Sequence, residues 1–539
     1  MKSQKIKKDS ILYDIIQILA FMQIAVIDMI RCSGDGVQWA CGNMITGICI
    51  GIILLSHWRR KAITRLYGAW IAGGIITLVA FFTAKYWFYY IPGLHYGETR
   101  ADLINLLLYF IIALQLVLDL VENKDKITVS CLLNRVKENA FLLFFFLFEI
   151  LSWVSQYDIH KPWYLFWWMI LGFLVPWEKK EKQRMASNML TGIIVGFWLI
   201  QGLAFAFRPY LAAFRRYRSM YFNANMYALL CYIAIIACLI KLYELRDKKW
   251  LRILMIISLC AIIALQIFTV GRAAILISAF TIVVFSAFVC FVYEKKPVWK
   301  WVKQLGICLC GVVVMVPVMY GCIRYLPLVL HRPIYVQDEY LQIADLKNKD
   351  SFMNPQDVLD EILSRTKRIS GNNMDEEKAE ELKNQEPADP DWEGKNYYLN
   401  WDTDYSALDL RAAIWKTFLS ESRLFGQKDS NYSEFISPYK QMFHSHNLFI
   451  QMIYGYGIIA GILFMAWIVF YMIRTVKHMF ANKNTAYGLV PFTFLLGILV
   501  FGMYEVVWQL GQITWFLLLF MQLFVMKESN EKCLNETAK

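Results

Sequence analysis

Charged residues are scarce in this chain. Asp, Glu, Lys and Arg make up 18% of its 539 residues, whereas about 25% is usual for a soluble domain. Hydrophobic residues make up 58%, and the mean hydropathy is +0.41. This composition excludes an ordinary soluble domain and indicates an integral membrane protein.

Cysteine is absent from the long polar stretch that follows Cys322, and no two cysteines in the chain are spaced as Cys-x-x-Cys. A disulfide framework in that stretch is therefore excluded, and so is a zinc site built from such pairs. The net charge of +12 is carried by short Lys and Arg clusters between apolar runs, so it does not indicate binding to nucleic acid.

Long apolar runs are abundant. A bilayer core requires about 20 apolar residues per helix, and on that rule the sequence predicts about fourteen spans. They start near residues 11, 38, 67, 103, 139, 163, 187, 224, 250, 273, 302, 447, 488 and 509. We therefore expect an all-α integral membrane protein with one large exterior loop that contains amphipathic helices.

Five regions follow from this division of the chain. They are N-terminal membrane helices (1–207), central membrane helices with exterior Arg loops (208–321), the large exterior loop (322–446), C-terminal membrane helices (447–526) and a cytoplasmic tail (527–539).

The orientation of the spans is predicted by charge. Loops rich in Lys and Arg alternate with poor ones, and the positive-inside rule places the rich loops in the cytoplasm. The rich loops are those at residues 2–8, 59–61, 124–126, 179–184, 248–249, 295–296 and 474–477. Both termini are then expected inside and the 322–446 loop outside, as in a multi-pass protein of the bacterial cytoplasmic membrane.

Two exterior turns break this rule. One holds Arg208, Arg215, Arg216 and Arg218, and the other holds Arg272 alone. A bound anion at the outer face would explain cations on the side that is otherwise poor in them. The alternative is that a span has been misplaced and that these are ordinary cytoplasmic charges.

The polar residues that suggest chemistry fall on the same side. They are Arg218, Arg272, Arg411, His444 and His446. An Arg guanidinium binds phosphate with two prongs and stays protonated, and His is the natural proton carrier near neutral pH. This set suggests an anionic lipid headgroup, such as a diphosphate, with a proton transfer beside it.

Simpler roles are open for each group. Any one of Arg215, Arg216 and Arg218 is as well suited to contacting membrane phosphates as to catalysis. His446 would be inert if it only capped the helix expected to begin near Asn447. His444 and His446 have a spacing that suits a metal, but no third ligand stands at a characteristic distance, so we expect no metal and no cofactor.

The large loop has two parts. Residues 345–396 are rich in acidic and polar residues and predict a solvated segment with some helix. Residues 406–425 carry apolar side chains at helical spacing, which predicts an amphipathic helix at the membrane surface with Arg411 on it. Glu149 lies within a predicted span and is a further candidate.

Three stretches resemble the O-antigen ligase and O-antigen polymerase superfamily of bacterial membrane glycosyltransferases. Residues 218–225 are similar to the family's Arg followed by an Asn-Pro-Asn-like helix start, and residues 269–273 to its Thr-x-Ser-Arg-Gly turn. Residues 411–461 resemble its series of Arg-x-x-x-Trp, Gly and His-Asn before a Gly-bearing helix. The chain departs from these patterns at Ala224, Gly271, Ala273 and Lys428.

The resemblance implies a metal-independent inverting transfer of a glycan from an undecaprenyl diphosphate carrier to an acceptor hydroxyl. It implies that His446 takes the hydroxyl proton and that Arg218 and Arg272 neutralise the diphosphate. Arg411 and Arg215 are the further expected diphosphate contacts. The expected partners are the carrier-linked glycan, a glycan or lipid acceptor and membrane lipids.

Three functions are open at this point. A polymerase of surface polysaccharide repeat units is favoured, because its acceptor is another carrier-linked glycan and no outer-membrane acceptor has to be assumed. A ligase would attach the glycan to another lipid or to the cell wall. A flippase for the lipid-linked glycan would be a transporter, which usually carries polar groups at the bilayer midplane on internally repeated halves; no such repeat is visible.

Overall fold

The structure is a computed structural model. It describes residues 129–156, 179–329, 352–367, 407–426, 435–442, 445–505 and 513–527, apart from residues 213, 214, 222, 438, 439 and 484, together with scattered residues between 11 and 25. The spans predicted near residues 38, 67, 103 and 163 lie outside the described residues, as does most of the acidic stretch 345–396.

Helices make up nearly all of the described chain. Six are long and apolar enough to cross a membrane. They are α8 (Lys179–Phe207), α9 (Ala224–Glu244), α10 (Lys249–Phe268), α11 (Arg272–Phe288) with its continuation η6 (Val289–Tyr293), α12 (Val298–Val329) and α17 (Ile458–Ala481). The described part of the chain therefore fits an all-α membrane protein, while the total of fourteen spans stays a prediction.

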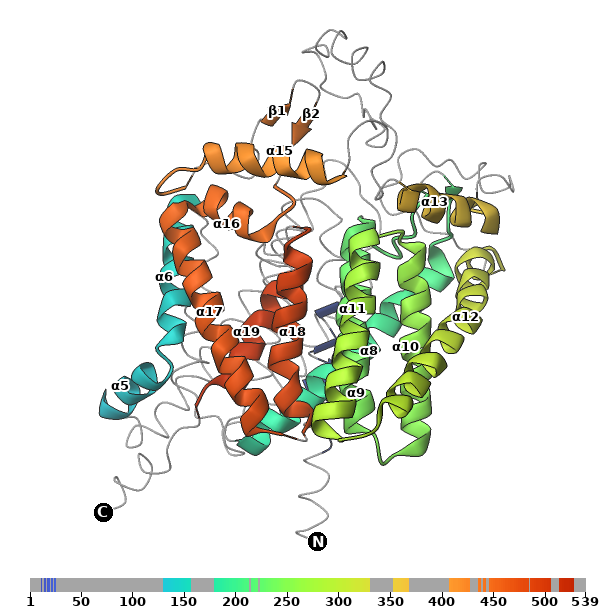
Figure 1. The fold of residues 1–539 in the computed structure, drawn as a ribbon, viewed down its shortest axis with the longest axis horizontal. Coiled ribbons are helices and arrows are strands. Elements are labelled where there is room, and N and C mark those ends of the chain that lie inside the picture. Colours follow the sequence, from blue (N-terminus) through green and yellow to red (C-terminus); the bar gives the residue numbers. More distant parts are fainter. Residues whose placement is uncertain are drawn as a thin grey trace, which may run out of the picture.

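Shorter helices complete the bundle. Four of them are α5 (Val129–Glu138) and α6 (Phe141–Gln156), and α18 (Ala486–Gly502) and α19 (Ile513–Val525), the last two lying in the middle of the bundle. Three others lie together at one end of the bundle, α13 (Pro355–Lys367), α15 (Ala407–Ser420) and α16 (Leu448–Tyr456) (Figure 1). Near α15 a small antiparallel hairpin pairs β1 (Phe435–Ser437) with β2 (Lys440–Met442).

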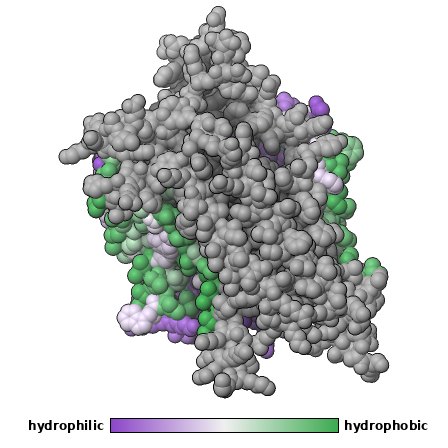
Figure 2. Space-filling view, turned by 180° about the vertical axis from the view of Figure 1, so that it is seen from behind, coloured by the Kyte–Doolittle hydropathy of each residue, from purple (hydrophilic) through white to green (hydrophobic). Residues whose placement is uncertain are grey.

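Helix α9 is the centre of the described bundle. It packs against α8, α10, α11 and α18, and 89% of its most apolar 18-residue stretch is buried. A helix that is apolar on all sides belongs in such a position. By contrast, only 11% of the most apolar 18-residue stretch of α12 is buried, and the described residues visible at the two edges of Figure 2 present mainly apolar surface. Exposed apolar side chains on α12 suit contact with lipid.

Lys residues at helix ends and the helices α13, α15 and α16 lie at opposite ends of the bundle. Helix α8 begins at Lys179, α10 begins at Lys249, and η6 is followed by Lys295 and Lys296, all at the lower end of Figure 1. Helices α13, α15 and α16 lie at the opposite end. The Lys-rich loops at residues 179–184, 248–249 and 295–296, which the structure describes, therefore share one end of the bundle.

Two expected boundaries differ from the structure. The large loop was expected from residue 322, but α12 continues to Val329 because its apolar sequence continues. A span was expected from residue 447, but α16 ends at Tyr456, just before Gly457, and α17 is a separate helix from Ile458. Gly457 has φ 99°, a conformation that breaks a helix and that residues with a side chain rarely adopt.

Candidate functional site

The Arg-rich turn at residues 208–223, which the sequence predicts to be exterior, is called here the Arg loop. It docks on the turn between α10 and α11: the backbone N–H of Tyr217 donates to the carbonyl of Phe268 at 2.8 Å, and Nε of Arg216 donates to the carbonyl of Thr269 at 2.7 Å. The two turns in which the sequence broke the charge rule are therefore in direct contact. Arg272, the first residue of α11, directly follows the second turn.

Strained backbone is concentrated in this region. Five non-glycine residues in the described chain have a positive φ, and four of them are Arg215, Ser219, Val270 and His446, with φ between 49° and 51°. Val270 is β-branched, for which this conformation is a genuine outlier. Such residues persist only where their surroundings enforce them, and they cluster at functional sites.

His446 lies immediately before α16 but does not cap it. The cap is Asn447, whose Oδ1 accepts from the backbone N–H groups of Phe449 at 2.9 Å and Ile450 at 3.2 Å. On the other side of His446, the carbonyl of Ser445 accepts from Nε1 of Trp415 at 3.1 Å. His446 is therefore not the helix cap. The residues on either side of it, Ser445 and Asn447, are both fixed by hydrogen bonds.

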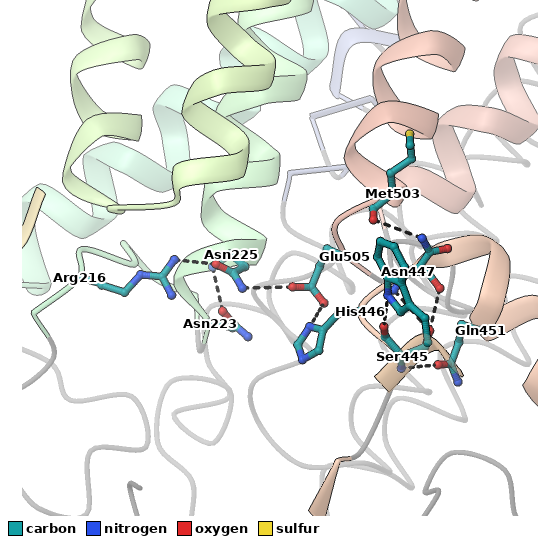
Figure 3. A network of polar contacts seen from close by, with 10 residues as sticks. Arg216, Asn223, Asn225, Ser445, His446, Asn447, Gln451, Met503 and Glu505 are labelled. Carbon is teal, nitrogen blue, oxygen red and sulfur yellow. Dashed lines mark hydrogen bonds and ion pairs between the residues drawn. The ribbon is translucent and has the colours of Figure 1, made fainter. Parts of the chain in front are cut away.

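The imidazole of His446 instead meets a carboxylate. Its Nδ1 lies 3.3 Å from Oε1 of Glu505, and the two side chains are 27% and 11% exposed. The other oxygen, Oε2, accepts from Nδ2 of Asn225 at 3.2 Å, and Oδ1 of Asn225 accepts from Arg216 at 2.6 Å. Figure 3 shows this row of contacts from Arg216 through Asn225 and Glu505 to His446.

Arg411 approaches the same carboxylate from α15. Its guanidinium carbon lies 5.6 Å from the centre of the Tyr504 ring. Burial lowers the pKa of Arg411, and the negative charge of Glu505 opposes that shift. Helix α15 is held on α16 by the buried Phe418, whose ring lies 4.7 Å from that of Tyr454. The expected amphipathic helix thus packs its apolar face on the protein.

The expected site residues fall into three groups. His446 contacts Glu505, and Arg411 lies near enough to be influenced by the charge of that carboxylate. Arg218 and Arg272 are half-buried, in the Arg loop and at the turn on which it docks. Arg215 is exposed, and His444 lies outside the described residues. For Arg216 the sequence suggested membrane contact as readily as catalysis. The structure connects it to Glu505 through Asn225.

Glu505 was missed in the sequence, although a signal was present. It is the only charged residue between Lys483 and Lys527. An ionisable residue alone in a long apolar segment is costly unless it has a partner, and it is a functional candidate on that ground. Its position at the end of α18, beyond Gly502, places it at the same end of the bundle as α15 and α16 (Figure 1).

The arrangement is suited to proton transfer. When Nδ1–H of an imidazole donates to a carboxylate, the lone pair that takes up a proton is on Nε2. The carboxylate then fixes the ring's tautomer and orientation and stabilises the imidazolium that forms. Within the part of the chain that the structure describes, no three His, Cys, Asp or Glu residues are grouped so as to hold a metal ion.

The sequence was compared with protein-family models and with curated proteins. The chain matches no protein-family model, and a search of the curated proteins finds no match.

Proposed function

We propose that this protein is a membrane glycosyltransferase that moves a glycan from an undecaprenyl diphosphate carrier to an acceptor hydroxyl, with His446 as general base. The observation that carries the proposal is the contact between His446 and Glu505 at an end of the bundle where several arginines gather. A base beside guanidinium groups is what an anionic leaving group and a hydroxyl nucleophile require.

The reaction uses each group once. The acceptor oxygen attacks the anomeric carbon while the bond from that carbon to the diphosphate oxygen breaks, and its electron pair leaves with the diphosphate. The hydroxyl proton passes to Nε2 of His446, and Glu505 stabilises the resulting imidazolium. Attack from the face opposite the leaving group inverts the anomeric carbon.

The arginines act on the leaving group. Arg218 and Arg272, with Arg411 and Arg215 as further contacts, neutralise the charge that develops on the diphosphate. Docking of the Arg loop on the turn before α11 supports joint action of Arg218 and Arg272, because it fixes the backbone of both segments relative to each other. Fixed donors need little rearrangement during the reaction, which is the basis of their effect.

The active site is proposed to face the outside of the bacterial cytoplasmic membrane. Lys-rich ends of the described helices lie opposite α15, α16 and His446, and the positive-inside rule assigns the Lys-rich end to the cytoplasm. The substrate is then a carrier-linked glycan that has already been moved across the membrane.

Polymerase activity is our preferred form of this function, with a ligase as the second form and a flippase as the competing class. Deletion of the gene separates them by product. Loss of a polymerase leaves single repeat units on the carrier, and loss of a ligase leaves long polymer that is not attached to its acceptor. Loss of a flippase leaves the carrier-linked glycan on the cytoplasmic side, and that result would contradict the proposal.

A further inference from the structure

The carboxylate of Glu505 needs external support to face His446. Helix α18 ends at Gly502, and Glu505 lies in the turn beyond it, where its backbone N–H donates to the carbonyl of Phe501 at 3.1 Å. A Glu side chain on such a turn has three rotatable bonds. His446 contacts Oε1 and Asn225 contacts Oε2.

The orientation of the Asn225 amide is fixed by its partners. A guanidinium has only donors, so Oδ1 of Asn225 must face Arg216, and a carboxylate has only acceptors, so Nδ2 must face Glu505. This position requires an acceptor on one side and a donor on the other, which an amide supplies. An Asp there would keep the contact with Arg216 and would set one carboxylate against another.

Both ends of Asn225 are anchored independently of Glu505. Its backbone N–H donates to Oδ1 of Asn223, the cap of α9, at 2.8 Å. Its partner Arg216 is in turn held by the carbonyl of Thr269, two residues before Gly271 and α11. Asn225 is therefore a fixed point between the Arg loop and the carboxylate.

We propose that Asn225 is a positioning residue for the transfer reaction, which holds Glu505 against His446 and couples the base to the Arg loop. The inference rests on the proposed function, because it assumes that His446 is the base. It assigns a task to the second Asn of the Asn223-Ala224-Asn225 sequence: the first Asn caps α9, and the second orients a carboxylate that lies 280 residues away in the chain.

The test compares Asn225→Asp with Asn225→Ala. Purified variants in lipid vesicles receive carrier-linked glycan extracted from the deletion strain, together with that strain's membrane fraction as a source of acceptor. Both variants should lower kcat by about 10- to 100-fold, the loss expected for one charge-assisted hydrogen bond, with KM for the donor changed less than about threefold. Thr485→Ala, which removes the side-chain cap at the start of α18, the end of that helix away from Glu505, should retain most of the activity.

A purely structural role predicts another pattern. If Asn225 only ties α9 to Arg216, Asn225→Asp keeps that tie and stays near wild type while Asn225→Ala loses activity, and this result would overturn the inference. A rise in KM for the donor with kcat unchanged would also overturn the inference. Asn225→Asp has the same shape as the native residue, so it decides the question even if Asn225→Ala does not fold.

The proposed function is tested separately in the same assay. His446→Ala should be inactive. If His446→Ala is inactive while both Asn225 variants are active, the inference alone fails. If His446→Ala is active, the proposed base fails, whatever the Asn225 variants show.

Discussion

Replacing Glu505 by Gln removes a negative charge and keeps the shape of the side chain. In the native row, Arg216 donates to Asn225, Asn225 donates to Glu505, and Nδ1–H of His446 donates to Glu505. Glu505 is thus required as an acceptor on both sides. A Gln supplies one acceptor and one donor, so it cannot satisfy both neighbours as they stand.

Only one arrangement of the Glu505→Gln variant satisfies both of these neighbours. The Gln oxygen accepts from Asn225, its NH2 group donates to Nδ1 of His446, and the ring proton moves to Nε2. That tautomer has no lone pair on the nitrogen that is to accept the substrate proton. Loss of the correct tautomer and of the carboxylate charge together should lower kcat by roughly 10²- to 10⁴-fold.

The assay is single-turnover transfer from the carrier-linked glycan, with Glu244→Gln as the matched control. Glu244 pairs with Lys241 at 2.9 Å, but it lies at the C-terminal end of α9, whereas Asn225 lies at its start. The control should keep activity within about threefold, since this pair lies at the other end of α9 from Asn225. A Glu505→Gln variant as active as this control would refute the assignment of Glu505 as the partner of the base.

Two further variants test the parts around this row. Gly457→Ala should lower the free energy of unfolding by roughly 2–6 kcal/mol and so lower the melting temperature. The residue has φ 99°, and a Cβ would lie 2.3 Å from the backbone nitrogen of Gly426. Gly202→Ala, where a Cβ meets nothing within 4 Å, is its control in the same thermal melt, and equal stability of the two would contradict the close contact. Arg272→Lys should lower kcat/KM by about 10- to 100-fold, because an ammonium does not reproduce two-pronged binding of a diphosphate. Unchanged kinetics with the carrier-linked donor would remove Arg272 from the site.

The helices themselves were largely predictable from the sequence. Helices α9 and α10 begin close to the predicted positions, because each is an apolar run bounded by polar residues. The end of α16 was not predictable, because the apolar sequence continues through it. The break at Gly457 depends on a close approach of the Gly426 backbone, which is a tertiary contact.

The candidate site was predictable in its residue types but not in its connections. Arginines on the otherwise cation-poor side and His446 before a helix were visible as anomalies of charge and position. The contact between Asn225 and Glu505 joins residues 280 positions apart, and no spacing rule reports such a pair. The sequence also gave no ground to choose Arg216 over its neighbours, because that choice depends on how the Arg loop folds back on Thr269.

The central claim, that His446 is the base of a glycan transfer, is tested most directly by comparing His446→Ala with His444→Ala. The two histidines are chemically identical and two residues apart. Both purified variants are placed in vesicles with the carrier-linked glycan, and transfer and donor binding are measured separately. The account predicts that His446→Ala binds the donor without transferring it, while His444→Ala loses far less activity. Near-normal transfer by His446→Ala would contradict the account.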